Sequence, residues 1–152
     1  MRNALRVGGL AMGLLWLGMT CGMAQSGGTA AEARAMLEKA VAALKSSEWG
    51  ALAKFMNPYG GFIDRDLHVF CYDTTDGHLT AHLDSRLLGT DIRTLRQKDG
   101  SPYGQRIFDA NKPGTIVTVD YNSPREGSSD LVPTQAVITI VGREGCGVSY
   151  FK

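Results

Sequence analysis

The sequence lacks most of the features that identify an enzyme or a nucleic-acid-binding protein. Its 152 residues contain no Gly-x-Ser-x-Gly motif, zinc signature, phosphate-binding loop or Cys-x-x-Cys pair. The three histidines are scattered, without a carboxylate cluster that would complete a metal site. Basic residues form no block or stripe to attract nucleic acid or an anionic membrane. We therefore expect a binding protein that is not an enzyme and uses no cofactor or metal ion.

Long apolar runs are also lacking, except at the start of the chain. Two arginines precede an apolar stretch over residues 7–20, and small residues follow up to Ala24. This pattern predicts a signal peptide over residues 1–24 that is cleaved after Ala24. A retained membrane anchor and lipid attachment at Cys21 are the alternatives. We expect a periplasmic or secreted protein with no membrane span after signal cleavage.

The mature chain has the length of one domain. Loss of the signal peptide leaves fourteen basic and fifteen acidic residues, a net charge of −1, so charge does not identify a partner. We expect a flexible lead over residues 25–29 and a single domain over residues 30–152.

Two helices are predicted directly after the lead. Thr29 and Glu32 fit a capping box, in which each side chain bonds the backbone amide of the other residue. Apolar residues then recur at helical spacing, namely Met36, Leu37, Ala40, Val41 and Leu44. A second, short helix is expected over residues 49–55, before an Asn-Pro pair and two glycines.

The remaining chain has the pattern of an antiparallel sheet. Strands are expected over residues 67–72, 78–83, 115–121, 131–141 and 146–151. Between the second and third strands lies an insertion with a helical turn and a short helix, the latter over residues 103–111. This order predicts an α+β, PAS-like domain with a five-stranded sheet and the long N-terminal helix on one face. The insertion would cover the other face and enclose a pocket.

Several ordered motifs resemble the single-Cache domain family. They are Asn57-Pro58, Gly61-Phe62-Ile63-Asp64, Asp66-Leu67-His68-Val69-Phe70, Asp76-Gly77, Ala81-His82, Leu87-Leu88-Gly89 and Asp99-Gly100-Ser101-Pro102-Tyr103-Gly104. The chain departs from the family where Leu83-Asp84-Ser85 replaces Pro-Asn-Pro. The resemblance implies a PAS-like extracytoplasmic sensor domain that recognises a small organic acid or related metabolite.

The resemblance also raises the question of how a bound ligand would be signalled. Family members continue into a membrane helix and an output domain, whereas this sequence ends directly after the last predicted strand. We expect a standalone exported member with no output domain, whose partner is a membrane receptor or another exported protein. The alternative is an exported protein–protein interaction module with a filled pocket, which would make contact through residues 122–130.

Six residues are candidates for ligand binding around the predicted pocket: His82, Arg86, Tyr103, Arg106, Asp120 and Tyr121. Either arginine could grip a carboxylate with its guanidinium fork. The histidine could donate a hydrogen bond, the tyrosines could form an aromatic wall, and the aspartate suits an amine. The alternatives are a structural histidine, solvated charges and aromatic core packing. His68 and His78 are predicted to lie on a strand surface.

Two cysteines remain in the mature chain, Cys71 and Cys146. In a PAS-like sheet their strands are adjacent and antiparallel, so we expect a disulfide, which is common in exported proteins. Pairing them also sets Val69 opposite Val148 and Leu67 opposite Tyr150. The alternative is two buried free thiols.

Overall fold

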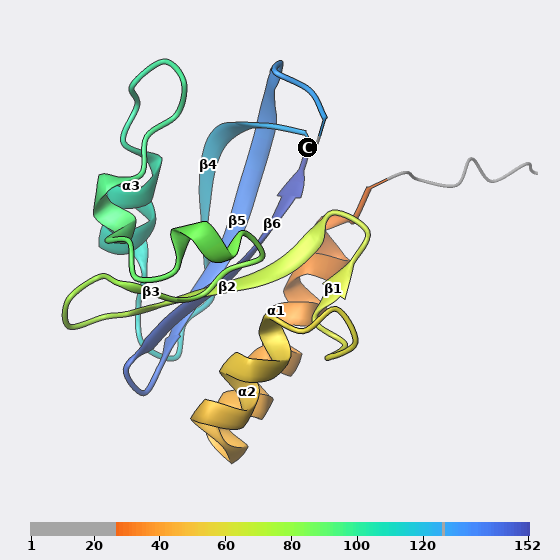
Figure 1. The fold of residues 1–152 in the computed structure, drawn as a ribbon, viewed down its shortest axis with the longest axis vertical. Helices are drawn as coiled ribbons and strands as arrows, with labels where there is room; N and C mark the ends of the chain where they lie inside the picture. Colours follow the sequence, from red (N-terminus) through yellow and green to blue (C-terminus); the bar gives the residue numbers. More distant parts are fainter. Residues whose placement is uncertain (1–26, 126) are drawn as a thin grey trace, which may run out of the picture.

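The computed structural model describes residues 27–125 and 127–152 (Figure 1). The predicted signal peptide, its cleavage site and Cys21 lie outside these ranges. The described elements are α1 (Ala30–Ser46), α2 (Glu48–Phe55), β1 (Ile63–Asp64), β2 (Leu67–Asp73), β3 (Leu79–Ala81), the 3-10 helices η1 (Ser85–Leu87) and η2 (Ile92–Thr94), α3 (Tyr103–Ala110), β4 (Val117–Pro124), β5 (Leu131–Val141) and β6 (Glu144–Phe151). No helix in this part of the chain is long and apolar enough to cross a membrane.

Both N-terminal helices begin at side-chain caps. The predicted capping box of Thr29 and Glu32 is present at the start of α1, and the Ser47 side chain accepts from the Gly50 N–H at the start of α2. The face of α1 that packs on the sheet consists of Ala33, Leu37, Ala40 and Leu44, all buried. The helical spacing of apolar residues therefore determines which side of α1 meets the sheet.

The sheet is antiparallel, in the order β1-β2-β6-β5-β4, and β3 pairs with the same edge of β2 as β1. The α+β, PAS-like architecture is thus confirmed, including the insertion between β3 and β4. β1 is an additional strand of two residues. β4 continues to Pro124, so the loop before β5 is shorter than predicted.

The central pair of strands is crosslinked. Cys71 on β2 lies directly opposite Cys146 on β6, with 4.1 Å between their Cα atoms, and the two form a disulfide. Val69 opposes Val148, as predicted. The β2–β6 ladder ends at Val69 and Val148, so the predicted pairing of Leu67 with Tyr150 is wrong. On the other edge of β2, Leu67 pairs with Asp64 of β1.

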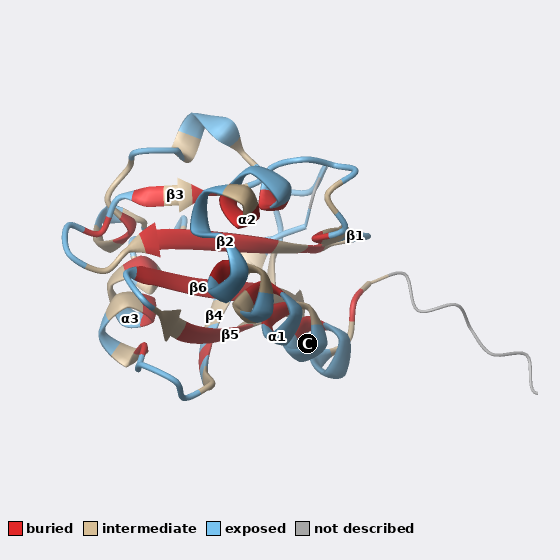
Figure 2. Ribbon diagram, turned by 90° about the horizontal axis from the view of Figure 1, so that it is seen from below, coloured by how far each residue is buried: buried red, intermediate tan, exposed pale blue. Residues whose placement is uncertain are grey.

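The two faces of the sheet carry separate cores, and strand alternation assigns residues to each. Leu67, Val69 and Cys71 of β2 pack with α1 and α2. Phe70 and Tyr72 pack with Ile92 and Ile107 of the insertion. Figure 1 shows α1 and α3 on opposite sides of the sheet, and Figure 2 shows that β2 and β6 are buried along most of their length.

The segment that precedes α1 lies against the domain where the structure describes it. In residues 27–29 of the predicted lead, Gly28 is buried and a Cβ there would lie 2.2 Å from Leu67. Its N–H donates to Oδ1 of Asp66 at 2.5 Å. The small size of Gly28 therefore lets the chain pass close to the start of β2.

Candidate functional site

A cavity of about 230 Å³ lies between the sheet and the insertion. Its lining is largely aromatic and aliphatic, with a few polar groups, and combines Asp66, His68, Phe70, Leu79, His82, Ile92, Leu95, Tyr103, Ile107, Tyr121, Ser123, Pro124, Thr134, Ser149, Tyr150 and Phe151. Apolar walls with a few placed polar groups are typical of small-molecule sites. We refer to this space as the insertion cavity.

Two histidines lie together in the wall of the insertion cavity. Their rings meet edge to face, with 5.6 Å between the centroids of His68 on β2 and His82 after β3. Burial, reinforced by the neighbouring His82, lowers the pKa of His68 to about 4, and burial also lowers the pKa of His82. Both rings are therefore neutral at neutral pH.

The loop after β3 determines the tautomer of His82. Its Nδ1 accepts a hydrogen bond from the Asp84 N–H at 2.9 Å. A neutral ring whose Nδ1 accepts must carry its proton on Nε2. His82 therefore offers an Nε2–H donor.

Tyrosines form a second polar part of the lining. The rings of Tyr103 on α3 and Tyr121 on β4 are stacked, with centroids 5.0 Å apart. Tyr121 donates its hydroxyl to Ser149 Oγ at 2.7 Å, and burial raises its pKa to about 12. Burial also raises the pKa of Tyr103, so both phenols stay protonated.

Asp66 contributes the acidic group of the lining. Oδ1 is engaged by Gly28, and the buried Oδ2 has no hydrogen-bond partner among the described residues. A Cβ on Gly27 would lie 2.8 Å from this Oδ2. This carboxylate therefore faces the segment before α1 rather than the open part of the cavity.

Arg106 and Asp120 border a different, more polar cavity of about 360 Å³. Asp120 accepts from Lys152 Nζ at 2.8 Å and from the Gln135 amide at 2.7 Å. Tyr121 and Thr134 line both cavities, so the two spaces are adjacent. The lining of the insertion cavity does not include Arg106 or Asp120.

Arg86 lies on the surface, away from the predicted position in the pocket. Its guanidinium binds both carboxylate oxygens of Asp84, at 2.9 and 2.7 Å, and the side chain is 87% exposed. This pairing lowers the pKa of Asp84 to about 2. The arginine is held by the residue two positions before it, and the lining of the insertion cavity does not include it.

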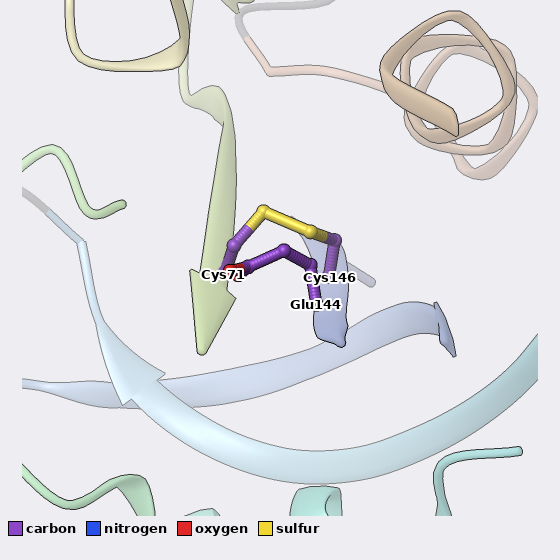
Figure 3. Close-up of side chains that lie close together, drawn as sticks. All are labelled: Cys71, Glu144 and Cys146. Atoms are coloured by element: carbon purple, nitrogen blue, oxygen red, sulfur yellow. A yellow bond between two sulfur atoms is a disulfide. The ribbon is translucent and has the colours of Figure 1, made fainter. Parts of the chain in front are cut away.

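The disulfide lies beside a buried carboxyl group on the opposite face of the sheet (Figure 3). Among residues 27–125 and 127–152, one group of side chains has the spacing of metal ligands. It consists of Cys71, Glu144 and Cys146. Because the two sulfur atoms are bonded to each other, neither is a thiolate that could bind a metal. Glu144 accepts from the Thr80 hydroxyl, and burial raises its pKa.

The structure thus brings together three of the six predicted ligand-binding residues: His82, Tyr103 and Tyr121. Sequence reasoning did not select His68, which we predicted to lie on a strand surface; the structure places it in the wall of the cavity. Strand alternation contains the missing signal, because His68 is three positions from Cys71 and therefore faces the insertion. Asp66 carried no such signal.

Fold and cavity together define the class: an α+β domain of PAS-like architecture with a cavity beneath its insertion. The sequence matches no family model and no curated protein. In three dimensions it is similar to a methyl-accepting chemotaxis protein from Vibrio parahaemolyticus RIMD 2210633, with a TM-score of 0.62 and 16% identity over 80% of this chain and 86% of that one.

Two further solved structures agree with this class. One is a periplasmic sensor domain of a chemotaxis protein, with a TM-score of 0.55 and 20% identity over 78% of this chain and 87% of that one. The other is a Cache chemosensory domain described for carboxylic acid recognition, with a TM-score of 0.56 and 16% identity over 78% and 85%. The chain therefore has the fold of Cache-type sensor domains, as the sequence resemblance predicts.

Proposed function

We propose that this protein is an exported, sensor-type binding domain that takes a small organic acid or related metabolite into the insertion cavity. It acts by binding rather than by catalysis, in the periplasm or outside the cell. A membrane receptor or another exported protein is the partner that would read the bound state. His82, Tyr103 and Tyr121 are the ligand-contacting residues predicted from the sequence that this proposal retains.

The observation that carries the proposal is the insertion cavity itself. Its volume of about 230 Å³ has room for a small organic molecule, since it equals the liquid volume of roughly eight waters at about 30 Å³ each. Apolar walls formed by Phe70 and Ile107 would hold such a molecule, and the histidine and tyrosine groups would orient it. A structural neighbour that recognises carboxylic acids supports the choice of ligand class.

The same cavity weighs against the alternative, an interaction module with a filled pocket. A filled pocket would leave no space between β6 and α3, and its polar groups would be bonded to each other. Here the Tyr103 hydroxyl and the Nε2–H of His82 make no hydrogen bond within the described residues. We therefore favour a small molecule as the primary ligand.

Thermal unfolding of the purified, oxidised protein with a panel of short carboxylates, amino acids and amines tests the proposal. A ligand at a hundred times its dissociation constant stabilises the folded state by about 2.7 kcal/mol, a readily measured rise in Tm. Phe70→Trp and Ile107→Trp, which fill the cavity, should abolish the rise if they fold. An absence of any shift across the panel would contradict the proposal and favour a protein partner.

A further inference from the structure

The insertion cavity has no permanent positive charge in its lining, which matters for the acidic ligand proposed above. Within the part of the chain that the structure describes, neither lysine nor arginine lines it. Asp66 lies beside His68 and Asp84 beside His82, and the other titratable groups of the lining are Tyr103, Tyr121 and Tyr150. Burial raises the pKa of Tyr103 and Tyr121, so these two phenols are uncharged at neutral pH, and Arg86 pairs with Asp84 outside the cavity. A carboxylate that enters this space therefore meets no full countercharge.

A cationic ligand has no accessible anchor there either. One oxygen of Asp66 is bonded to the Gly28 N–H, and the other is buried beside Gly27. An ammonium group could reach neither oxygen without displacing the segment before α1. Asp66 therefore offers no direct contact to a ligand in the cavity.

The polar groups left for a ligand are hydrogen-bond donors. Ser123 and Thr134 are bonded to each other at 2.7 Å, and Tyr121 donates to Ser149. The Nε2–H of His82 and the Tyr103 hydroxyl remain as donors. This arrangement suits the oxygens of a carboxylate rather than an amine.

One further donor would appear if His68 took up a proton. Burial of the His68 ring opposes that proton when no ligand contributes a charge. A bound carboxylate beside the two rings would reverse the balance, because an opposite charge within a few ångströms favours the imidazolium form. The negative carboxylate of the ligand would stabilise protonated His68. Protonated His68 would in turn provide the positive charge that pairs with the carboxylate.

We propose that the insertion cavity binds a short monocarboxylate together with one proton, which the facing pair His68 and His82 takes up as the anion enters. The proposal rests on the sensor function inferred above and names its ligand class and its anchor. It requires that a carboxylate bind more tightly in mildly acidic solution. The cavity would therefore select small anions with a single negative charge, which one proton on the two rings can neutralise.

Isothermal titration calorimetry of the full protein with pyruvate, acetate and propionate tests the proposal. Pyruvate remains ionised above pH 5, so any proton taken up with it is held by the protein. Titrations at pH 7 in buffers of different ionisation enthalpy should give about one proton taken up per pyruvate. Affinity should fall by up to about tenfold for each pH unit above 6, the limit for one linked proton.

Variants of the histidines assign the proton. His68→Gln and His82→Gln retain neutral hydrogen-bonding groups but cannot hold the charge, so they should weaken binding and lower the proton count. His78→Gln is the matched control, because that ring is exposed and lies outside the cavity. If a cavity variant does not fold, the number of protons that the unaltered protein takes up per pyruvate still tests the proposal.

The outcomes separate this inference from the function it rests on. Binding of a carboxylate with no proton uptake and constant affinity from pH 5.5 to 7.5 would overturn the inference and leave the sensor function intact. Binding of an amine that weakens in acid would overturn the inference and change the ligand class. Failure of all three acids to bind at any pH would overturn the inference, and the wider panel of carboxylates, amino acids and amines would then decide the sensor function.

Discussion

The two faces of the sheet are built from the same strands but by different means. On the helix face, Leu37 and Ala40 of α1 pack on Val69 and Val148 above the disulfide, and these side chains are fully buried. On the other face a chain segment with only short helices covers the sheet and leaves the insertion cavity. Around the disulfide the first face is thus a closed core, whereas the second encloses the insertion cavity.

This difference shows how one short strand serves both stability and binding. β2 contributes Val69 and Cys71 to the closed core and His68 and Phe70 to the cavity. Substitutions at neighbouring positions of β2 should therefore have different consequences. Substitutions on the helix face should lower the free energy of unfolding. Substitutions on the cavity face should change how stability depends on pH and how tightly a ligand binds.

The largest expected effect is on the helix face. Replacing Cys71 and Cys146 together by alanine should lower the free energy of unfolding by about 4 kcal/mol, because the disulfide closes a loop of 75 residues. Urea unfolding measures the change. A reductant should lower the stability of the unaltered protein similarly and leave the double variant unaffected. An unaltered protein that unfolds at the same urea concentration with and without reductant would contradict this assignment.

The next effect belongs to the cavity face and depends on pH. The pKa of His68 is about 4 in the folded protein and about 6.5 in a model peptide, so between these values the unfolded chain binds a proton that the folded one does not. Above pH 6.5 both states are neutral and the effect vanishes. Stability should therefore fall by about 3 kcal/mol as pH drops from 6.5 to 4, at about 1.4 kcal/mol per pKa unit.

Urea unfolding across this pH range, without ligand, measures that loss. His68→Gln should flatten the curve, whereas His78→Gln should leave the loss in place. An equally steep curve for His68→Gln would show that another group is responsible.

A smaller effect should follow from closing the space beside Phe70. A Cβ on Gly147 would lie 2.5 Å from Phe70 Cζ and 2.7 Å from a methyl carbon of Ile138. Gly147→Ala should therefore cost about 1–3 kcal/mol of stability through overpacking. In a double-mutant cycle, Phe70→Leu should relieve part of that cost. Strictly additive losses would show that the two side chains do not compete for this space.

The smallest effect should come from Arg86. Its side chain is exposed and paired with Asp84, so Arg86→Ala should leave the affinity for a cavity ligand within about twofold, as expected of a surface ion pair. Calorimetry with any ligand found in the panel measures this. Loss of binding would return Arg86 to the role of carboxylate anchor that the sequence suggested.

Local patterns and the cysteine pair were enough to predict most of the fold. Helical spacing located α1, turn residues bounded the strands, and Cys71 opposite Cys146 predicted the register of the central pair. β1 was missed because two residues are too short for a periodic signal. The extension of β4 to Pro124 was missed because its polar sequence resembles a loop, although it pairs with β5.

The candidate site was less predictable, because a site depends on which segment covers which face. His82, Tyr103 and Tyr121 were selected as residues near the insertion, and they line the cavity. His68 was assigned to a surface because strand alternation indicates which face it lies on but not that the insertion covers that position. Arg86 lies on the surface because its guanidinium binds the carboxylate of Asp84, two residues before it.

The pairing of β2 with β6 also affects the order of events in folding. Every other pair of strands is close in sequence, whereas this central pair joins segments 75 residues apart. A reduced chain must find that contact by diffusion and bear the entropy of closing the loop. An oxidised chain begins with it closed, so the strand pairs that remain to form join segments close in sequence. Refolding of the crosslinked chain should therefore be faster than refolding of the reduced chain.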